Sequence, residues 1–314
     1  MAEIRITVEG VPPEGIRLDR HCASQPGAIS RSRLKGGALE IRVNGKPARL
    51  SRLVRDGDLI SISWEDPEPA SIEPEEIPLR IIYEDERVTV VDKPQGMVTH
   101  PASGNWSGTL VNALLWHWGR APIASGTVDD QARLRPGIVH RLDKDTSGVI
   151  IAARTREAEE WLQGEFQSRR ARKVYAAILT RVPPSVRGEI RTRIYRDPAN
   201  RKRFKAGDDE RKGKAAHTSY KVVHAWGRYA LVLFLLHTGR THQLRVHSKH
   251  IGCPILGDPV YGKKDPLFPD ASLMLHARSL EIRLPGDEQR TRFVSRTPPR
   301  FRDVIARLEE TNGK

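Results

Sequence analysis

An acidic, proline-rich stretch at residues 65–80 divides this 314-residue chain into a small part and a large part. The stretch reads EDPEPASIEPEEIPLR and holds six acids, one base and four prolines. Proline has no backbone N–H and a fixed φ, so such a segment is poorly suited to a helix or to the middle of a sheet. Because it also has few apolar side chains to bury, it predicts an extended linker. We therefore expect one domain at residues 1–64 and a second at residues 81–314.

The small part has the pattern of an α/β module. Residues 17–62 read as a helix, a loop, a short helix that begins at Ser30, and then strands, with a hairpin turn signal at Asn44-Gly45. Residues 31–55 contain eight bases and a single acid. A solvated surface could have this composition, but so many cations on one short helix and hairpin favour a phosphate-binding surface.

Strands outnumber helices in the large part. A helix is expected at residues 107–119, capped by Ser107, and another directly after Thr155, with acids in its first turn. The basic stretch 196–216 is expected to be an exposed loop. Apolar and β-branched runs predict strands at residues 87–94, 149–154, 173–179, 217–226, 229–236 and 279–284.

The fold class follows from how these predicted elements are connected. Two of the strands are separated only by Gly227-Arg228, which is too short a connection for a parallel crossover. Strands predominate and helices are few, so the expected class is α+β. We expect a mixed, largely antiparallel sheet with flanking helices, preceded by the small α/β module.

The charge of the chain points to a polyanionic partner. The net charge is +14, with 53 Lys and Arg against 39 Asp and Glu. Nucleic acid is therefore the first partner to consider and an anionic membrane the second, although no basic helix with a continuous apolar side is evident. No apolar run approaches the ~20 residues that a membrane-spanning helix needs. The start of the chain alternates like a strand, and we expect a cytoplasmic protein.

Cofactor and metal chemistry have no visible site in the sequence. Neither G-x-x-x-x-G-K-[ST] nor G-x-G-x-x-G after a strand is present. The histidines of residues 237–250 have no Asp or Glu among them, and the bases nearby would repel a cation. Asp143 and Asp145 could together hold Mg²⁺, but Arg141 and Lys144 beside them disfavour it. We expect neither a cofactor nor a metal.

Asp143 is the one carboxylate whose setting suggests chemistry. It lies between Arg141 and Lys144, directly before a Thr-Ser-Gly turn and a buried strand. Such an Asp can simply bond to the backbone of its own turn. It can also act as a nucleophile or a base supported by cations. Its local sequence is compatible with both interpretations.

Several segments resemble a known family, and they occur in the family's order. Residues 140–148 (HRLDKDTSG), 172–178 (RKVYAAI) and 238–247 (TGRTHQLRVH) resemble the three signature segments of the RluA family of RNA pseudouridine synthases. Residues 100–117 and 250–262 resemble the flanking segments of the same family, especially of its ribosomal-RNA-directed members. The likeness extends from about residue 80 to 296, and residues 1–64 resemble more loosely the S-four RNA-binding domain.

The resemblance implies a role for four residues. Asp143 matches the family's catalytic aspartate, and Arg141 matches the arginine that helps to displace the target nucleotide from the RNA stack. Tyr175 matches the tyrosine that stacks on the flipped base. Arg245 matches the arginine that pairs with the catalytic carboxylate, and we expect it just inside a helix capped by Thr241. The implied fold is that of the pseudouridine synthases, with a central cleft.

These observations predict an isomerase that converts uridine to pseudouridine in RNA, most simply in large-subunit ribosomal RNA. Substrate and product contain the same atoms at the same oxidation level, which agrees with the absence of a cofactor signature. Asp143 would attack as a nucleophile or remove a sugar proton. The alternatives are a tRNA-directed pseudouridine synthase and a non-catalytic RNA-binding factor for ribosome assembly. We expect a monomer that does not bind membranes.

Overall fold

The computed structural model describes residues 2–24, 38–64, 72–101, 105–119, 136–200 and 203–312. The chain forms two compact units. The first comprises Met1–Ser71 with Thr127–Ala132, and the second comprises Ile72–Gly126 with Arg133–Lys314. In the described part of the chain, no helix is both long and apolar enough to cross a membrane.

The smaller unit is a small antiparallel sheet with one described helix. Its apolar core contains the fully buried side chains of Leu18, Val43 and Ile60. Asn44 and Gly45 both have positive φ and join two strands, which confirms the predicted hairpin turn. The helix predicted at Ser30 lies outside the described residues. The four-stranded sheet has the order β1 (Ala2–Thr7), β6 (Leu59–Trp64), β3 (Ala38–Val43), β4 (Lys46–Pro47). A separate pair of strands consists of β2 (Ile16–Arg17) and β5 (Leu53–Val54). Strand β2 leads directly into helix α1 (Leu18–Ser24).

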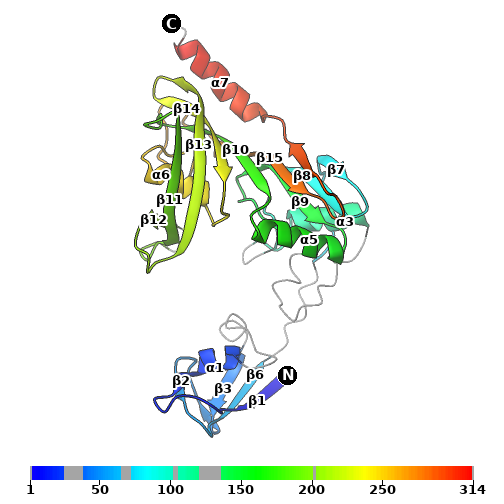
Figure 1. The fold of residues 1–314 in the computed structure, drawn as a ribbon, viewed down its shortest axis with the longest axis vertical. Helices are drawn as coiled ribbons and strands as arrows, with labels where there is room; N and C mark the ends of the chain where they lie inside the picture. Colours follow the sequence, from blue (N-terminus) through cyan, green and yellow to red (C-terminus); the bar gives the residue numbers. More distant parts are fainter. Residues whose placement is uncertain are drawn as a thin grey trace. The chain divides into compact units, whose positions relative to one another are not determined.

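The larger unit contains a ten-stranded mixed sheet (Figure 1). Described neighbours pair antiparallel except β9 and β15, which are parallel. This confirms the predicted fold class. In spatial order the strands are β12 (Phe204–Gly207), β11 (Arg187–Arg196), β13 (Lys214–Trp226), β14 (Tyr229–Leu236), β10 (Arg172–Leu179), β15 (Leu275–Arg283), β9 (Ser147–Ala153), β8 (Val88–Lys93) and β7 (Ile81–Glu84), with β16 (Arg290–Val294) paired to β15.

Helices α3 (Leu110–Trp118) and α5 (Arg156–Gln167) cover the two faces of the β8–β9 part of this sheet. Alternate residues of a strand face opposite sides. Accordingly, Ile150 packs into the cluster that contains α3, and Ile151 into the cluster that contains α5. Two further helices of the described residues, α6 (Gln243–His250) and α7 (Pro299–Asn312), belong to this unit, and α7 was not predicted. Strands β8 and β9 are therefore buried on both faces, which explains their continuous apolar sequences.

The predicted cap of α3 and the predicted loop at residues 196–216 were wrong. Thr109, not Ser107, is the N-cap of α3, because its side chain and that of Asn112 form a capping box. The stretch 196–216 is not one loop, since it contains all of β12 and the start of β13. Its basic residues pointed to solvent exposure, but a strand at the edge of a sheet also carries charged side chains. The predicted N-cap at Thr155 is confirmed.

The second half of the acidic stretch packs on the larger unit. Residues 65–71 lie outside the described part, but Ile72 is buried in the core that contains α3. The Glu75 N–H donates to the Asn112 carbonyl, and the Glu75 carboxylate accepts from the Gly108 N–H. The packed unit thus begins several residues before the predicted boundary at residue 81. The alternating apolar residues of 72–79 contact the core even though their neighbours are acids and prolines.

Candidate active site

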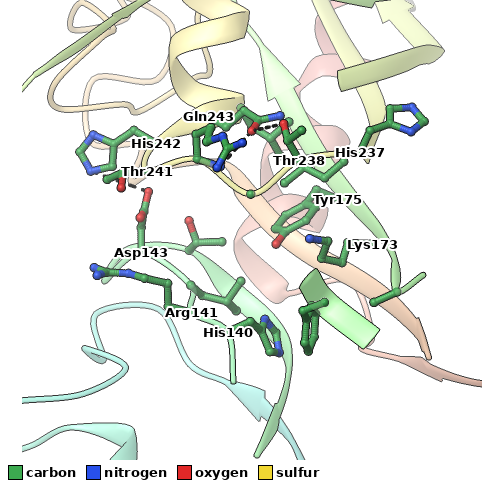
Figure 2. Close-up of a pocket in the computed structure, with 18 of the residues that line it drawn as sticks. His140, Arg141, Asp143, Lys173, Tyr175, His237, Thr238, Thr241, His242 and Gln243 are labelled. Atoms are coloured by element: carbon green, nitrogen blue, oxygen red, sulfur yellow. Dashed lines mark hydrogen bonds and ion pairs between the residues drawn. The ribbon is translucent and has the colours of Figure 1, made fainter. Parts of the chain in front are cut away.

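A cavity of about 430 Å³ opens where the segment before β9, strand β10 and the start of β15 meet the loop that precedes α6. Its lining comes from residues 139–146, 166–175 and 236–245, with one further residue from β15. Figure 2 shows these side chains converging from different parts of the chain. The four predicted site residues, Arg141, Asp143, Tyr175 and Arg245, all line this cavity.

The backbone around Asp143 explains how its carboxylate reaches the cavity. The main-chain carbonyl of Asp143 accepts from the Thr146 N–H at 3.0 Å, which closes the turn. The Thr99 hydroxyl fixes the preceding residue through the Leu142 carbonyl at 2.8 Å. Gly148 then has φ +113°, and a Cβ there would lie 2.2 Å from the Ala277 carbonyl oxygen. Only glycine allows β9 to approach β15 this closely. The turn uses the backbone of Asp143 and leaves the side chain for the cavity.

Arg245 contacts Asp143, but its firmer partner is Asp258. The distance from Arg245 Nη1 to Asp143 Oδ2 is 3.5 Å, whereas Nε and Nη2 each lie 2.8 Å from an Asp258 oxygen. Burial would raise the pKa of Asp258, but the Arg245 hydrogen bonds and charge outweigh it and lower that pKa. The guanidinium also lies over the Tyr261 ring, 5.2 Å from its centre. A buried, two-point ion pair therefore fixes the arginine that faces Asp143.

His242 is a second neighbour of Asp143. Its Nε2 lies 3.9 Å from Asp143 Oδ2, and its Nδ1 is 2.9 Å from the Tyr261 hydroxyl. That hydroxyl accepts from the Phe204 N–H, so its own proton is free for Nδ1. This pairing favours the tautomer with a proton on Nε2, directed toward Asp143. Burial lowers the pKa of His242 despite the opposing effect of Asp143, so the ring is neutral at pH 7.

The predicted cap at Thr241 was wrong. Helix α6 begins at Gln243, and its N-cap is His242, which has φ +56° and makes no capping bond with its side chain. The side-chain oxygen of Gln243 accepts from the Arg240 N–H at 2.9 Å and from the Thr238 hydroxyl at 2.8 Å. A side chain inside the helix therefore holds the preceding loop. The position of Arg245 near the start of a helix was predicted correctly.

Tyr175 and Lys173 form another side of the cavity. Both belong to β10 and, being two residues apart, share one face of that strand. Burial, helped by the Asp143 charge, raises the pKa of Tyr175, so the phenol stays protonated. Its hydroxyl makes no hydrogen bond to any other described residue. The ring and the hydroxyl are both available to a molecule in the cavity.

Lys93 does not line the cavity, but it supports the turn that carries Asp143. The side chain is fully buried, and its ammonium donates to the carbonyls of Pro94, Met97 and Lys144 at 2.9, 2.7 and 3.2 Å. Burial lowers its pKa to about 7, although Asp143 and Asp145 oppose the shift. In the sequence, Lys93 stands out only because it lies between an apolar strand and a proline.

Arg141 differs from the other three predicted residues because it is exposed. It lines the mouth of the cavity, and among the described residues it has neither a hydrogen bond nor an ion pair from its side chain. An arginine in this position can reorient to meet a large anionic ligand.

His247, two residues after Arg245, serves the fold. His247 is fully buried, and its two ring nitrogens lie 3.0 and 2.9 Å from the hydroxyls of Thr192 and Thr218. Burial lowers its pKa to about 4, so it is neutral at pH 7. Within the described ranges, no three His, Cys, Asp or Glu residues are grouped as metal ligands.

Sequence reasoning missed Asp258, His242 and Lys93. The signal for Asp258 was present, because it is the first acid after residues 211–257, a stretch of 47 residues that contains none. Its pairing with Arg245 depends on the turn at residues 258–262, where its Oδ1 also accepts from the Val260 and Tyr261 N–H groups. Proximity of this kind is not visible in the sequence.

Taken together, the fold and the cavity define a basic protein whose pocket is lined by the Asp143 carboxylate, by arginines and by the Tyr175 ring. Residues 87–250 match the family of RNA pseudouridylate synthases, which is half of the chain. The chain belongs to this family, whose members isomerise uridine to pseudouridine in RNA. The predicted family and enzyme class are thereby confirmed.

Individual relatives agree with this assignment. The chain is 41% identical to "Ribosomal large subunit pseudouridine synthase D" of Borreliella burgdorferi over 93% of this chain and 89% of that protein. It is 37% identical to the protein of the same name from Pseudomonas aeruginosa, over 94% and 93% of the two chains. Among solved structures, "Human RNA Pseudouridylate Synthase Domain Containing 4" matches with a TM-score of 0.57 and 27% identity, over 73% of this chain and 93% of that one.

Proposed function

We propose that this protein converts one or more uridines of large-subunit ribosomal RNA to pseudouridine, with Asp143 as the catalytic carboxylate. The observation that carries the proposal is the placement of the Asp143 side chain, which faces the cavity while its backbone closes the turn. The names of the Borreliella and Pseudomonas relatives support large-subunit ribosomal RNA as the substrate.

Asp143 acts at the sugar of the target nucleotide. The reaction breaks the bond between N1 of uracil and C1′, turns the base, and rejoins it through C5. Asp143 either adds to C1′ or removes a sugar proton, and both roles need an ionised, oriented carboxylate. The Arg245 guanidinium supplies the orientation, since Asp258 restrains it on two nitrogens and leaves Nη1 directed at Asp143. His242 adds a neutral N–H donor on another side.

Arg141 and Tyr175 prepare the base for this chemistry. An enzyme that acts on a base inside folded RNA must first bring it out of the stack and support it on an aromatic or apolar surface. Arg141 is exposed at the mouth of the cavity, where it can take the place of the displaced nucleotide. Tyr175 lies deeper and offers its ring. Replacing Tyr175 with Leu should cost more activity than replacing it with Phe, because Phe keeps the stacking surface.

The smaller unit would hold the RNA by its phosphates. It resembles an S-four RNA-binding domain, and eight bases occur in residues 31–55. None of the residues assigned to chemistry belongs to it. We further propose that the protein is a monomer and works in the cytoplasm, where ribosomal RNA is made and assembled. A tRNA-directed enzyme and a non-catalytic assembly factor are the competing functions.

Mapping pseudouridines in total RNA from cells with and without the gene tests the proposal. We expect one or a few positions of large-subunit ribosomal RNA to lose pseudouridine and to regain it with the wild-type gene. Complementation with Asp143→Asn should not restore them. Sites lost only from tRNA would overturn the ribosomal substrate, and restoration by Asp143→Asn would overturn the assigned role of Asp143.

A further inference from the structure

Lys173 reaches into the cavity from the strand that carries Tyr175. It precedes Tyr175 by two residues on β10, and both side chains line the cavity. A Cβ added to Gly239 would lie 3.7 Å from Lys173 Nζ, so the ammonium faces the loop that precedes α6. In Figure 2 Lys173 lies beside Tyr175 and well apart from Asp143. The cavity therefore has a carboxylate on one side and a cation on another.

This cation has no polar partner in the described part of the protein. Lys173 forms neither a hydrogen bond nor an ion pair with other described residues, and its contact there is the Phe166 ring, 5.6 Å from Nζ. Burial lowers the pKa of Lys173. A half-buried charge without a partner is unfavourable for the fold. Folding therefore does not explain the ammonium, whereas a negatively charged group in the cavity would.

The reaction itself produces such a group. When the bond between N1 and C1′ breaks, both of its electrons remain on uracil, and the negative charge is shared by N1, O2 and O4. A fixed cation stabilises charge that develops in the transition state far more effectively inside a cavity than in water. The uracil is expected on Tyr175, and Lys173 is the adjacent cation on the same strand face.

We propose that the Lys173 ammonium is a catalytic cation that donates a hydrogen bond to a carbonyl oxygen of the flipped uracil and stabilises its negative charge while the base is detached. The inference rests on the assigned activity and on Asp143 acting at the sugar. Lys173 gives up no proton in this role. When C5 bonds to C1′, the hydrogen on C5 leaves as a proton and N1 takes one up, so atoms and charge balance.

A second anion could occupy the same place, namely a phosphate of the RNA backbone. A phosphate contact and a contact to the detached base predict different kinetic effects when Lys173 is replaced. A phosphate contact binds the substrate and the transition state about equally, so its removal weakens binding and leaves the saturated rate unchanged. Its removal also lowers the log–log salt slope of binding by about 0.7 to 0.9. Stabilising the detached base acts on the rate alone.

The experiment compares Lys173→Met and Lys173→Arg with wild type under single turnover, with enzyme saturating. The substrate is a bacterial large-subunit ribosomal RNA transcript labelled with tritium at C5 of uridine, which is released on isomerisation. We expect Lys173→Met to lower the saturated rate by about 100-fold or more, as for the loss of one donor to a developing anion. RNA affinity and salt slope should stay unchanged, and Lys173→Arg should recover part of the rate.

The controls separate this inference from the assigned function. Wild-type turnover is measured first, and if the ribosomal transcript is not modified, that substrate is rejected and the same variants are compared on labelled total tRNA. Lys221→Met removes an exposed lysine of β13 that does not line the cavity, and it should keep the wild-type rate. Thermal melting checks folding, and Lys173→Gln replaces the Met variant if that does not fold. A saturated rate within about threefold of wild type, or weaker binding with a smaller salt slope at full rate, would overturn the proposal.

Discussion

Two lysines near the cavity have opposite surroundings. Lys93, at the end of β8, is fully buried and donates to three carbonyls, one of which belongs to the turn that carries Asp143. Lys173, on β10, is half-buried and has no polar partner among the described residues. Burial lowers the pKa of both. The ammonium of Lys93 is therefore hydrogen-bonded within the folded protein, whereas the ammonium of Lys173 is available to a ligand.

The two sides of the cavity differ in the same way, since the polar groups near Asp143 have protein partners and those of Tyr175 and Lys173 have none in the described part of the chain. On the side of Asp143, partners are fixed before any substrate arrives, since Arg245 is held by Asp258 and His242 by Tyr261. On the side of Tyr175 and Lys173, the polar atoms have no protein partner within the described residues. A rigid side suits a group whose direction decides the chemistry. Polar groups without protein partners suit the recognition of a base, because the base has hydrogen-bond donors and acceptors of its own. This division can be tested.

The largest expected effect is from Asp143→Asn. Amide and carboxylate are nearly the same size, but only the carboxylate is an effective nucleophile or base, so the saturated rate should fall by at least about 10³-fold. Melting temperature and RNA affinity, measured on the same preparation, should stay close to those of wild type. Appreciable residual turnover would show that the rigid side does not carry the chemistry.

Asp258→Asn should have the next largest effect on the rate, and it should lower the stability of the fold as well. It removes the close partner of a buried ion pair and leaves the Arg245 charge with only the 3.5 Å contact to Asp143. Breaking a buried pair typically costs about 3–5 kcal/mol of stability. The substitution also releases the arginine that orients Asp143, so the saturated rate should fall. Chemical denaturation and single-turnover rates measure both effects.

Asp265→Asn is a matched control for that variant. Asp265 is also a buried carboxylate that pairs with an arginine, Arg228, but it does not line the cavity. It should lower stability and leave the saturated rate unchanged. An equal loss of rate in both variants would mean that Asp258 acts only through stability.

Lys93→Met should destabilise the protein, in contrast to Lys173→Met. The buried carbonyl of Met97 and the partly buried carbonyls of Pro94 and Lys144 lose a donor, although Lys144 still accepts from the Gly96 N–H. An unsatisfied buried group costs about 1–3 kcal/mol, partly offset because a buried charge is also removed. We expect a net loss of about 1–3 kcal/mol by chemical denaturation. Lys173→Met should be neutral or slightly stabilising, because Lys173 has no polar partner to leave unsatisfied. Equal effects of the two variants would contradict the comparison of the lysines.

The pH dependence of Lys93→Met can be predicted with its sign. The folded-state pKa of Lys93 is about 7 and the ordinary value is 10.5. Between these values the unfolded chain holds a proton that the folded protein has released, so wild-type stability rises with pH through this window. Lys93→Met lacks this contribution, so its deficit relative to wild type should widen from pH 7 toward pH 10. A constant deficit would mean that Lys93 stays protonated in the folded protein.

The smallest effect on rate is expected from deleting residues 1–65. The deletion removes all described strands and the described helix of the smaller unit, together with its basic residues, and leaves every residue that lines the cavity in place. RNA binding should weaken, and its log–log salt slope should flatten by about 0.7 to 0.9 for each phosphate that the protein no longer binds. The saturated rate should change little, because phosphate contacts position the RNA. A collapse of the saturated rate with the larger unit still folded would show that the smaller unit takes part in catalysis.

Local sequence patterns predicted much of the secondary structure because they report on nearby residues. Apolar runs located six of the ten strands of the large sheet, Asn44-Gly45 located a hairpin, and Thr155 located a helix cap. The prediction at Ser107 was wrong because Thr109, two residues later, can form a capping box with Asn112. The loop expected at 196–216 was wrong because charge alone does not distinguish an exposed loop from an edge strand.

The sequence by itself determined that the chain is a basic, two-part α+β protein, and its motifs named Asp143, Arg141, Tyr175 and Arg245 as residues of one site. Only the tertiary structure decided how that site is held. Asp258 lies thirteen residues after its partner Arg245. Lys93 donates to the carbonyl of Lys144, which lies fifty-one residues later in the turn that carries Asp143. Lys173 was present in a recognised motif, but its lack of a partner is a property of the folded cavity. Hydrogen bonds and burial depend on distances in space, and a linear pattern records those distances only within a turn, a helix or a strand.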